Sequence, residues 1–204
     1  MKLNLKNLLS AAIVMVVMSA CSSNDAPAPE NDGEQITRVE MIFLNVDAPN
    51  EAPLTALAVD EDGAGVKDFE IKKGVELKPN TTYDLTFKIL NEFAEAGDQD
   101  IAAEIKEEGV DHQFYFAFPE DAFTNPKGDG NIDAKAEDAV NYKDQDANGL
   151  PIGLETTWTT GEATTSTDGE FHLMLKHQPK IKSATSTSKD GESDIDLKFP
   201  FGIK

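Results

Sequence analysis

Residues 144–155 combine carboxylates, an amide and a glycine at the spacing of a calcium-binding loop. The segment reads DQDANGLPIGLE. Calcium takes six to eight oxygen ligands, and such loops supply them from positions 1, 3, 5, 7 and 12, with Gly at position 6 for the sharp turn. The spacing therefore predicts a Ca²⁺ site, and its ligands are Asp144, Asp146, Asn148, the backbone carbonyl of Leu150, and Glu155.

A second interpretation of the same residues needs no metal. Pro151 and the threonine-rich stretch after it do not look like the helix that usually follows a calcium loop. The dipeptide Asn148-Gly149 favours a tight turn by itself, with solvated aspartates around it. Both interpretations stay open, and a bound calcium ion would stiffen a loop between strands rather than perform chemistry.

A second candidate site for a metal combines carboxylates and imidazoles from two distant segments. Glu108, Asp111 and His112 lie close together in the chain, and His177 lies far downstream. Imidazole and carboxylate ligands suit transition metals, and imidazole also binds haem iron. This site forms only if the fold brings the two segments together. The alternative is that each histidine makes ordinary hydrogen bonds at the rim of the fold.

Motifs of catalysis are absent from the sequence. It contains no G-x-S-x-G, H-E-x-x-H, P-loop or G-x-G-x-x-G pattern. Trp158 and Tyr142 flank the segment 144–155 and are able to form a stacking platform for a sugar or flat cofactor. Packing in the core is the alternative. We expect a binding or structural protein and not an enzyme.

The first twenty residues have the layout of a bacterial lipoprotein signal peptide. Lys2 and Lys6 precede an uncharged apolar run over 8–18, and small residues follow. Cys21 is the only cysteine, so the chain has no internal disulfide and no other thiol for catalysis. We expect cleavage before Cys21 and lipidation of its thiol, which anchors the protein to a membrane through more than one acyl chain.

Residues 21–34 are predicted to form the lipidated cysteine and a flexible tether, because they are rich in Ser, Pro, Asn and acidic groups. Ser22 and the acidic residues after it favour the outer membrane, with display on the cell surface. The formal net charge of −20 at pH 7 repels phosphate backbones, which argues against nucleic-acid binding.

The remainder, residues 35–204, is predicted to be a single domain rich in strands. Apolar and polar residues alternate with the period of a half-buried strand, and Gly, Asn, Asp and Pro punctuate the segments between. Such segments occur at 36–46, 53–60, 68–78, 81–90, 113–118, 151–160, 169–177 and 193–201. A short helix is expected at 101–108, and a long acidic loop at 119–138. The pattern predicts an all-β, immunoglobulin-like antiparallel β-sandwich.

Four segments together resemble a group of small, uncharacterised bacterial outer-membrane lipoproteins. They are EIKEEGVDHQFYF, the DQDANGLPIGL loop, KHQP at 176–179, and GESDIDLKF at 191–199. Some lipoproteins of this kind act beside TonB-dependent receptors in nutrient capture. The resemblance implies a binding or accessory role, and it places His112 and His177 inside the shared segments.

Two functions follow from these observations. The first is a lipid-anchored outer-membrane or cell-surface protein that binds a ligand, such as a metal or haem, beside a TonB-dependent receptor. The second is a structural or adhesive surface lipoprotein whose loop at 144–155 binds calcium for rigidity. Approach of His112 to His177 favours the first, whereas oxygen atoms converging between Asp144 and Glu155 favour the second.

Overall fold

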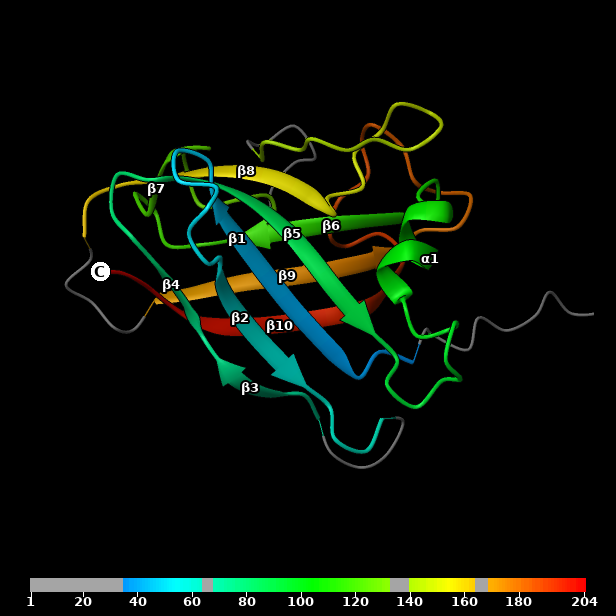
Figure 1. The fold of residues 1–204 in the computed structure, drawn as a ribbon. Helices are drawn as coiled ribbons and strands as arrows, with labels where there is room; N and C mark the ends of the chain where they lie inside the picture. The colour runs from blue at the N-terminus through cyan, green and yellow to red at the C-terminus, as the bar shows by residue number, and fades with distance from the viewer. Residues whose placement is uncertain (1–34, 64–67, 133–139, 164–168) are drawn as a thin grey trace, which may run out of the picture. The chain divides into compact units, whose positions relative to one another are not determined.

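The computed structural model describes residues 35–63, 68–132, 140–163 and 169–204. These residues form two facing β-sheets and one short helix, so the predicted all-β sandwich is confirmed (Figure 1). The predicted signal peptide, Cys21 and the tether lie outside the described residues. No helix among the described residues is long and apolar enough to cross a membrane.

A six-stranded sheet with the order β3-β2-β1-β5-β8-β7 faces a four-stranded sheet with the order β4-β10-β9-β6. The elements are β1 (Arg38–Asn45), β2 (Leu54–Val59), β3 (Glu70–Lys73), β4 (Val75–Leu77), β5 (Thr82–Leu90), α1 (Ile101–Glu107), β6 (His112–Ala117), β7 (Phe123–Asn125), β8 (Glu155–Thr160), β9 (Gly169–His177) and β10 (Glu192–Ile203). β7 lies inside the predicted long loop at 119–138, of which 133–139 lie outside the described residues.

The expectation of a purely antiparallel sandwich needs one correction. β4 pairs with the end of β10 in parallel, with Val75 opposite Phe201 and Leu77 opposite Ile203. β3 and β4 follow one another directly but belong to different sheets, so this segment passes from one layer to the other at Gly74. A Cβ atom at Gly74 would lie 2.6 Å from the Pro200 carbonyl oxygen, so the crossing requires glycine.

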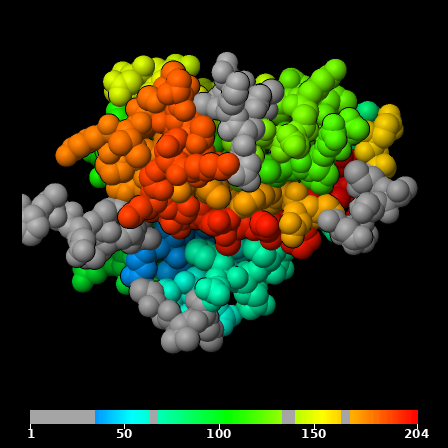
Figure 2. All heavy atoms as spheres, turned by 180° about the vertical axis from the view of Figure 1, so that it is seen from behind, coloured from blue at the N-terminus to red at the C-terminus, as the bar shows by residue number. Residues whose placement is uncertain are grey.

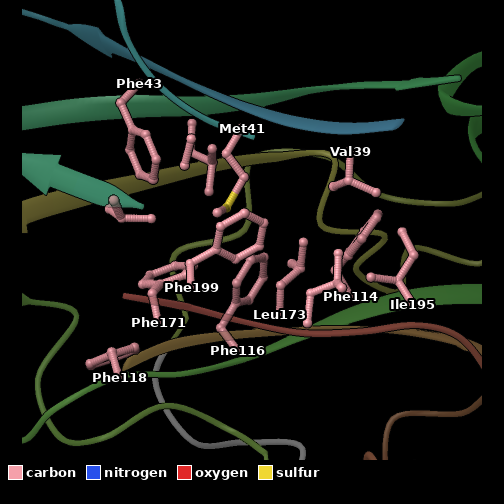
Figure 3. Packing of buried hydrophobic residues seen from close by; sticks show 14 of the residues in the cluster. Val39, Met41, Phe43, Phe114, Phe116, Phe118, Phe171, Leu173, Ile195 and Phe199 are labelled. Atoms are coloured by element: carbon pink, nitrogen blue, oxygen red, sulfur yellow. The ribbon is translucent and has the colours of Figure 1, made fainter. Parts of the chain in front are cut away.

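The alternating pattern of the sequence explains which side chains fill the space between the sheets. In β5, Tyr83, Leu85 and Ile89 are buried, while the polar residues between them face outward. Figure 3 shows Met41 and Phe43 of β1 pointing toward Phe116 and Phe199 of the other sheet. The core is therefore continuous between the layers.

Aromatic rings concentrate at one part of this core. Phe171 lies 5.5 Å from Trp158 and 6.0 Å from Phe116, measured between ring centroids. Trp158 is fully buried, and its indole Nε1 donates a hydrogen bond of 2.6 Å to Thr156. Trp158 therefore packs in the core and is not available as a surface stacking platform.

Helix α1 forms where the sequence predicts a helix. The Asp100 carboxylate accepts a hydrogen bond from the Ala103 amide and so caps the first turn. Ile101 and Ile105, four residues apart, lie on one face and are buried. The helix ends at Glu107, shortly before β6, and it covers one end of the sandwich (Figure 1).

Replacing Phe171 with Ala is expected to lower the free energy of unfolding by about 3–5 kcal/mol, because the side chain is fully buried among aromatic rings. Chemical denaturation measures this change. Phe93→Ala is the control: Phe93 is 59 % exposed, so its loss is expected to cost less than about 0.5 kcal/mol. Equal losses for the two variants would contradict the packing described above.

Candidate functional site

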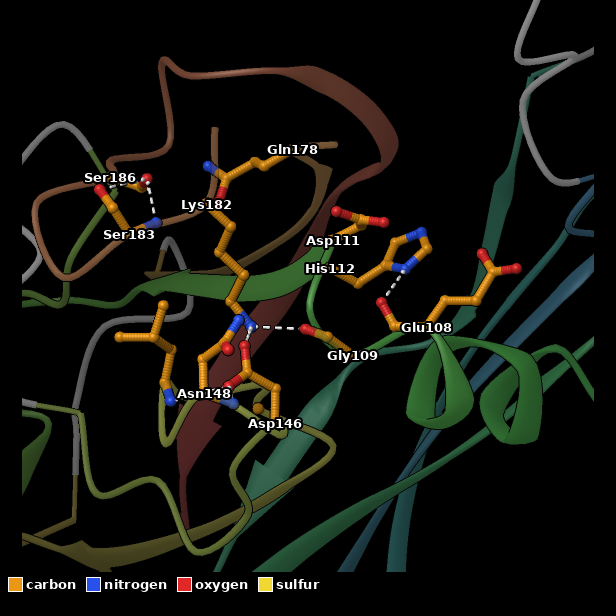
Figure 4. Close-up of polar contacts among 12 residues, drawn as sticks. Glu108, Gly109, Asp111, His112, Asp146, Asn148, Gln178, Lys182, Ser183 and Ser186 are labelled. Carbon is orange, nitrogen blue, oxygen red and sulfur yellow. Dashed lines mark hydrogen bonds and ion pairs between the residues drawn. The ribbon is translucent and has the colours of Figure 1, made fainter. Parts of the chain in front are cut away.

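Three loops meet at one end of the sandwich and form what we call the rim. They are the link between α1 and β6 (108–111), the acidic loop (144–154), and the loop between β9 and β10 (178–191). The Gln178 amide donates a hydrogen bond of 2.6 Å to the Asp111 carbonyl, and the Lys182 ammonium donates one of 2.6 Å to the Gly109 carbonyl. Figure 4 shows these residues together, and the view from behind shows the orange chain that includes the β9–β10 loop at one end of the molecule (Figure 2).

Backbone amides of the acidic loop surround its two aspartates. The Asp144 carboxylate accepts hydrogen bonds of 2.9 Å from the amides of Gly153 and Leu154, one on each oxygen. Oδ1 of Asp146 accepts hydrogen bonds from the amides of Asn148 and Leu150, at 2.8 and 2.9 Å. The aspartates therefore stabilise the turn geometry of the loop directly.

The other predicted calcium ligands make contacts of their own or are exposed. The carbonyl of Leu150 accepts a hydrogen bond from the Asp146 amide. The side chain of Asn148 is exposed, and that of Glu155 lies 3.9 Å from the Lys106 ammonium. Across the described ranges, no three His, Cys, Asp or Glu side chains converge as a ready metal site. Calcium binding by this loop stays a prediction of its spacing.

Lys182 places a buried positive charge against the loop. Its Nζ lies 2.9 Å from Oδ2 of Asp146, and the two side chains are 1 % and 0 % exposed. Sequence reasoning missed Lys182, because no spacing rule connects a lysine in the β9–β10 loop to an aspartate thirty-six positions earlier. The contact depends on how the two loops pack.

Burial and hydrogen bonding act against each other on the two loop aspartates. At Asp144 burial dominates and raises the pKa of the carboxyl, although the backbone amides oppose it. At Asp146 burial also acts to raise the pKa, but the Lys182 ammonium and the amides of Leu150 and Asn148 outweigh it. The pKa of Asp146 therefore lies below its usual range, and the carboxylate stays ionised beside the lysine.

The structure brings His112 and His177 together. They are directly opposite each other on the paired strands β6 and β9. Their imidazole rings stack with centroids 4.7 Å apart and planes 16° from parallel. His112 is buried and His177 is half-buried, so the pair lies where the core ends and the rim begins.

The two predicted carboxylate partners play other roles. Glu108 contributes its backbone carbonyl, which accepts a hydrogen bond of 3.2 Å from Nδ1 of His112 (Figure 4). The side chain of Asp111 accepts a hydrogen bond from the Lys180 amide. Their contribution to the rim is therefore structural, through the chain segments that hold the histidines.

Asp194 is the carboxylate that faces the histidine pair. Its Oδ2 lies 3.7 Å from Nε2 of His112, and the two side chains are 4 % and 2 % exposed. Among the described residues this oxygen has no hydrogen-bond partner. Burial, the largest influence, raises the pKa of the Asp194 carboxyl to about 6, although His177 opposes the shift.

A β-bulge explains why the sequence did not indicate Asp194. Simple alternation places it on the polar face of its strand together with Asp196 and Lys198. In the structure, Ser193 is opposite Lys176 and Ile195 is opposite Leu175, so Asp194 is the extra residue of β10. A bulge re-aims the side chain of such a residue, and here it turns the carboxylate toward His112.

A separate hollow of about 470 Å³ lies between β5 and α1. Phe87 and Leu90 contribute apolar surface, and Lys88 and Lys106 contribute charge. It is open and includes neither His112 nor His177, but Leu154 at the end of the acidic loop and Glu155 also line it, so it adjoins the rim.

Comparisons of the chain with protein-family models, with curated proteins and with solved structures found no match.

The pKa of Asp194 predicts how its replacement changes stability with pH. The pKa of the Asp194 carboxyl is higher in the folded protein than in the unfolded chain. Below about pH 4 the group is protonated in both states and does not change the free energy of unfolding. As pH rises through 6, this free energy falls, because the folded protein must then hold a buried charge. With a chelator present, Asp194→Asn is expected to unfold at the same free energy as the parent at pH 4. At pH 8 it should be more stable by on the order of 1–3 kcal/mol.

Denaturant titrations at the two pH values test this expectation. Asp196→Asn is the matched control, since Asp196 lies on the same strand with its side chain 53 % exposed beside His172. A loss of stability for Asp194→Asn at pH 8 would show that the carboxylate is favourably paired, contrary to the geometry.

Proposed function

We propose that this protein is a lipid-anchored binding protein of the outer membrane or cell surface. In this proposal, Cys21 carries the anchor and residues 22–34 act as the tether. The binding site is the cluster of His112, His177 and Asp194, and its ligand is a transition metal ion or a metal complex such as haem. A TonB-dependent receptor beside it in the membrane would receive the ligand.

The observation that carries this proposal is that two hydrogen-bond acceptors face each other in a buried space. Burial lowers the pKa of His112 and favours the neutral ring, and Nδ1 donates its proton to the Glu108 carbonyl, so the lone pair of the neutral ring is on Nε2. Nε2 faces Oδ2 of Asp194 at 3.7 Å, which is beyond hydrogen-bond length. A cation between the two atoms would be attracted to both.

The separation and its surroundings suit a first-row transition ion. Bonds of about 2.1 Å to nitrogen and oxygen in a tetrahedral site place neighbouring ligand atoms roughly 3.4 Å apart. The measured 3.7 Å between Nε2 of His112 and Oδ2 of Asp194 is close to this value. Metal-bound histidines also commonly donate the other ring proton to a carbonyl, as His112 does to Glu108.

His177 is the proposed third ligand and the entrance to the site. In the stacked arrangement its lone pairs lie in a plane almost parallel to that of His112, so the two rings do not point to one shared position. Rotation of the His177 side chain is required to complete the site. His177 is half-buried, so its ring is the member of the pair with access to solvent.

The second candidate function, a structural or adhesive surface lipoprotein, is favoured by one observation. The amides that bind Asp144 and Asp146 make the acidic loop a well-ordered turn without catalytic features. In that function the rim would contact other surfaces through a rigid loop, and calcium would add stiffness.

Titration calorimetry and native mass spectrometry of the chain from residue 22 test the metal proposal, with zinc, copper, nickel, calcium and haem each offered alone. We expect one equivalent of a transition ion or haem to bind. Asp194→Asn and His177→Ala should each weaken this binding by about 10-fold or more, because each removes a ligand. His172→Ala should leave it unchanged, since His172 pairs with Asp196 on the outer face.

The outcomes separate the two functions. Failure of every transition ion and of haem to bind would reject the histidine site. Saturable calcium uptake that Asp144→Ala abolishes would favour the structural function instead. Circular dichroism of each variant establishes that it folds, so a lost affinity reports on the site.

A further inference from the structure

We infer that Lys182 is the resident cation of the acidic loop: its ammonium replaces the calcium ion that the spacing of the loop predicts. The Nζ atom lies 2.9 Å from Oδ2 of Asp146 and donates a hydrogen bond of 2.6 Å to the Gly109 carbonyl. Figure 4 shows the lysine reaching between these two partners. This inference does not rest on the proposed function.

Amide donors and one ammonium of the protein already lie against the carboxylate oxygens of Asp144 and Asp146. The amides of Gly153 and Leu154 use both oxygens of Asp144, and two further amides use Oδ1 of Asp146. The Lys182 ammonium lies 2.9 Å from Oδ2 of Asp146 as an ion pair, although among the described residues this oxygen accepts no aligned hydrogen bond. Amides present hydrogens to three of the four oxygens and the ammonium charge lies against the fourth, so a calcium ion would have to displace them before it reached six ligands at 2.3–2.6 Å.

Burial makes this ion pair indispensable to the loop. The side chains of Lys182 and Asp146 are essentially inaccessible to water, so neither charge is solvated if the other is removed. Removing one partner of a buried pair is strongly destabilising, because it leaves an uncompensated charge. An ammonium fixed to the chain needs no metal from the surroundings, so the loop keeps its shape whatever the calcium concentration.

The same contact positions the histidine pair. Gly109 is three residues before His112, and Lys182 is five residues after His177. Lys182 therefore ties together the segments that enter β6 and leave β9, and it fastens both to the acidic loop through Asp146. Lys182 is in this sense a positioning residue for the rim.

Thermal unfolding of the purified protein with EGTA or with millimolar calcium tests the inference. The parent is expected to show a change in midpoint of less than about 1 °C between the two conditions, because no calcium binds the native loop. Lys182→Met is expected to lower the midpoint by roughly 6–20 °C, the cost of a buried charge left without its partner. Asp146→Asn in that background should recover part of the loss.

Lys143→Met is the matched control. Lys143 forms an ion pair with Asp84 at 2.8 Å, but those side chains are 45 % and 32 % exposed. Its loss should lower the midpoint by no more than about 4 °C, because solvated ion pairs contribute little. Any larger effect of Lys182→Met then reports on burial and not on the mere loss of a lysine.

Two results would overturn the inference. One is a saturable rise of the parent's midpoint with calcium that Asp144→Ala abolishes. The other is a Lys182→Met variant no less stable than Lys143→Met. If Lys182→Met does not fold, the calcium titration of the parent decides alone. EGTA also removes transition ions, so both conditions use protein stripped of metal beforehand, and failure of the transition-ion site stays distinguishable from failure of this inference.

Discussion

The antiparallel register of β9 against its two neighbours is the constraint on which both the core and the rim depend. Each strand residue of β9 has a partner on β6 or β10, so Phe171, Leu173 and Leu175 all face the other sheet. The same register continues one step further and sets His177 opposite His112. A slip by one residue would turn the apolar row of β9 away from the core, and it would also separate the two imidazoles.

The sequence predicted the parts of the fold that depend on local pattern. Alternation along β5, β9 and β10 identified buried faces, because one side of each strand packs on the opposite sheet. Asp100 and the spacing of Ile101 and Ile105 identified the helix. These features are properties of a few adjacent residues, so a single sequence contains them.

The parts that were missed depend on contacts between distant segments. The parallel pairing of β4 with β10 follows from where Gly74 lets the chain change layers. Asp194 faces the histidines because a bulge reverses the parity of its strand. Lys182 reaches Asp146 through the packing of two loops. A spacing motif shows which side chains are present in the sequence. It does not show which hydrogen-bond donors contact their oxygen atoms in the folded protein.

Three carboxylates in or beside the rim differ in what faces them. Backbone amides donate hydrogen bonds to Asp144, and an ammonium lies against Asp146. Oδ2 of Asp194 has no hydrogen-bond partner among the described residues, although its side chain is almost completely buried, and the charges of His177 and Lys176 only partly offset this burial. Leaving a carboxylate in this condition opposes folding, and such strain in proteins is commonly found at functional sites.

The contacts of these carboxylates assign a rigid part and a proposed binding part to one small region. The amides and Lys182 hold the acidic loop and the two adjoining segments in fixed positions, so the strand ends that carry the histidines have little freedom. His177 retains access to solvent, and Asp194 retains an unsatisfied oxygen. A site that binds selectively requires a rigid frame around the groups that meet the ligand. Lys182 supplies part of that frame, because its ammonium is held by Asp146 and Gly109 and does not face Oδ2 of Asp194.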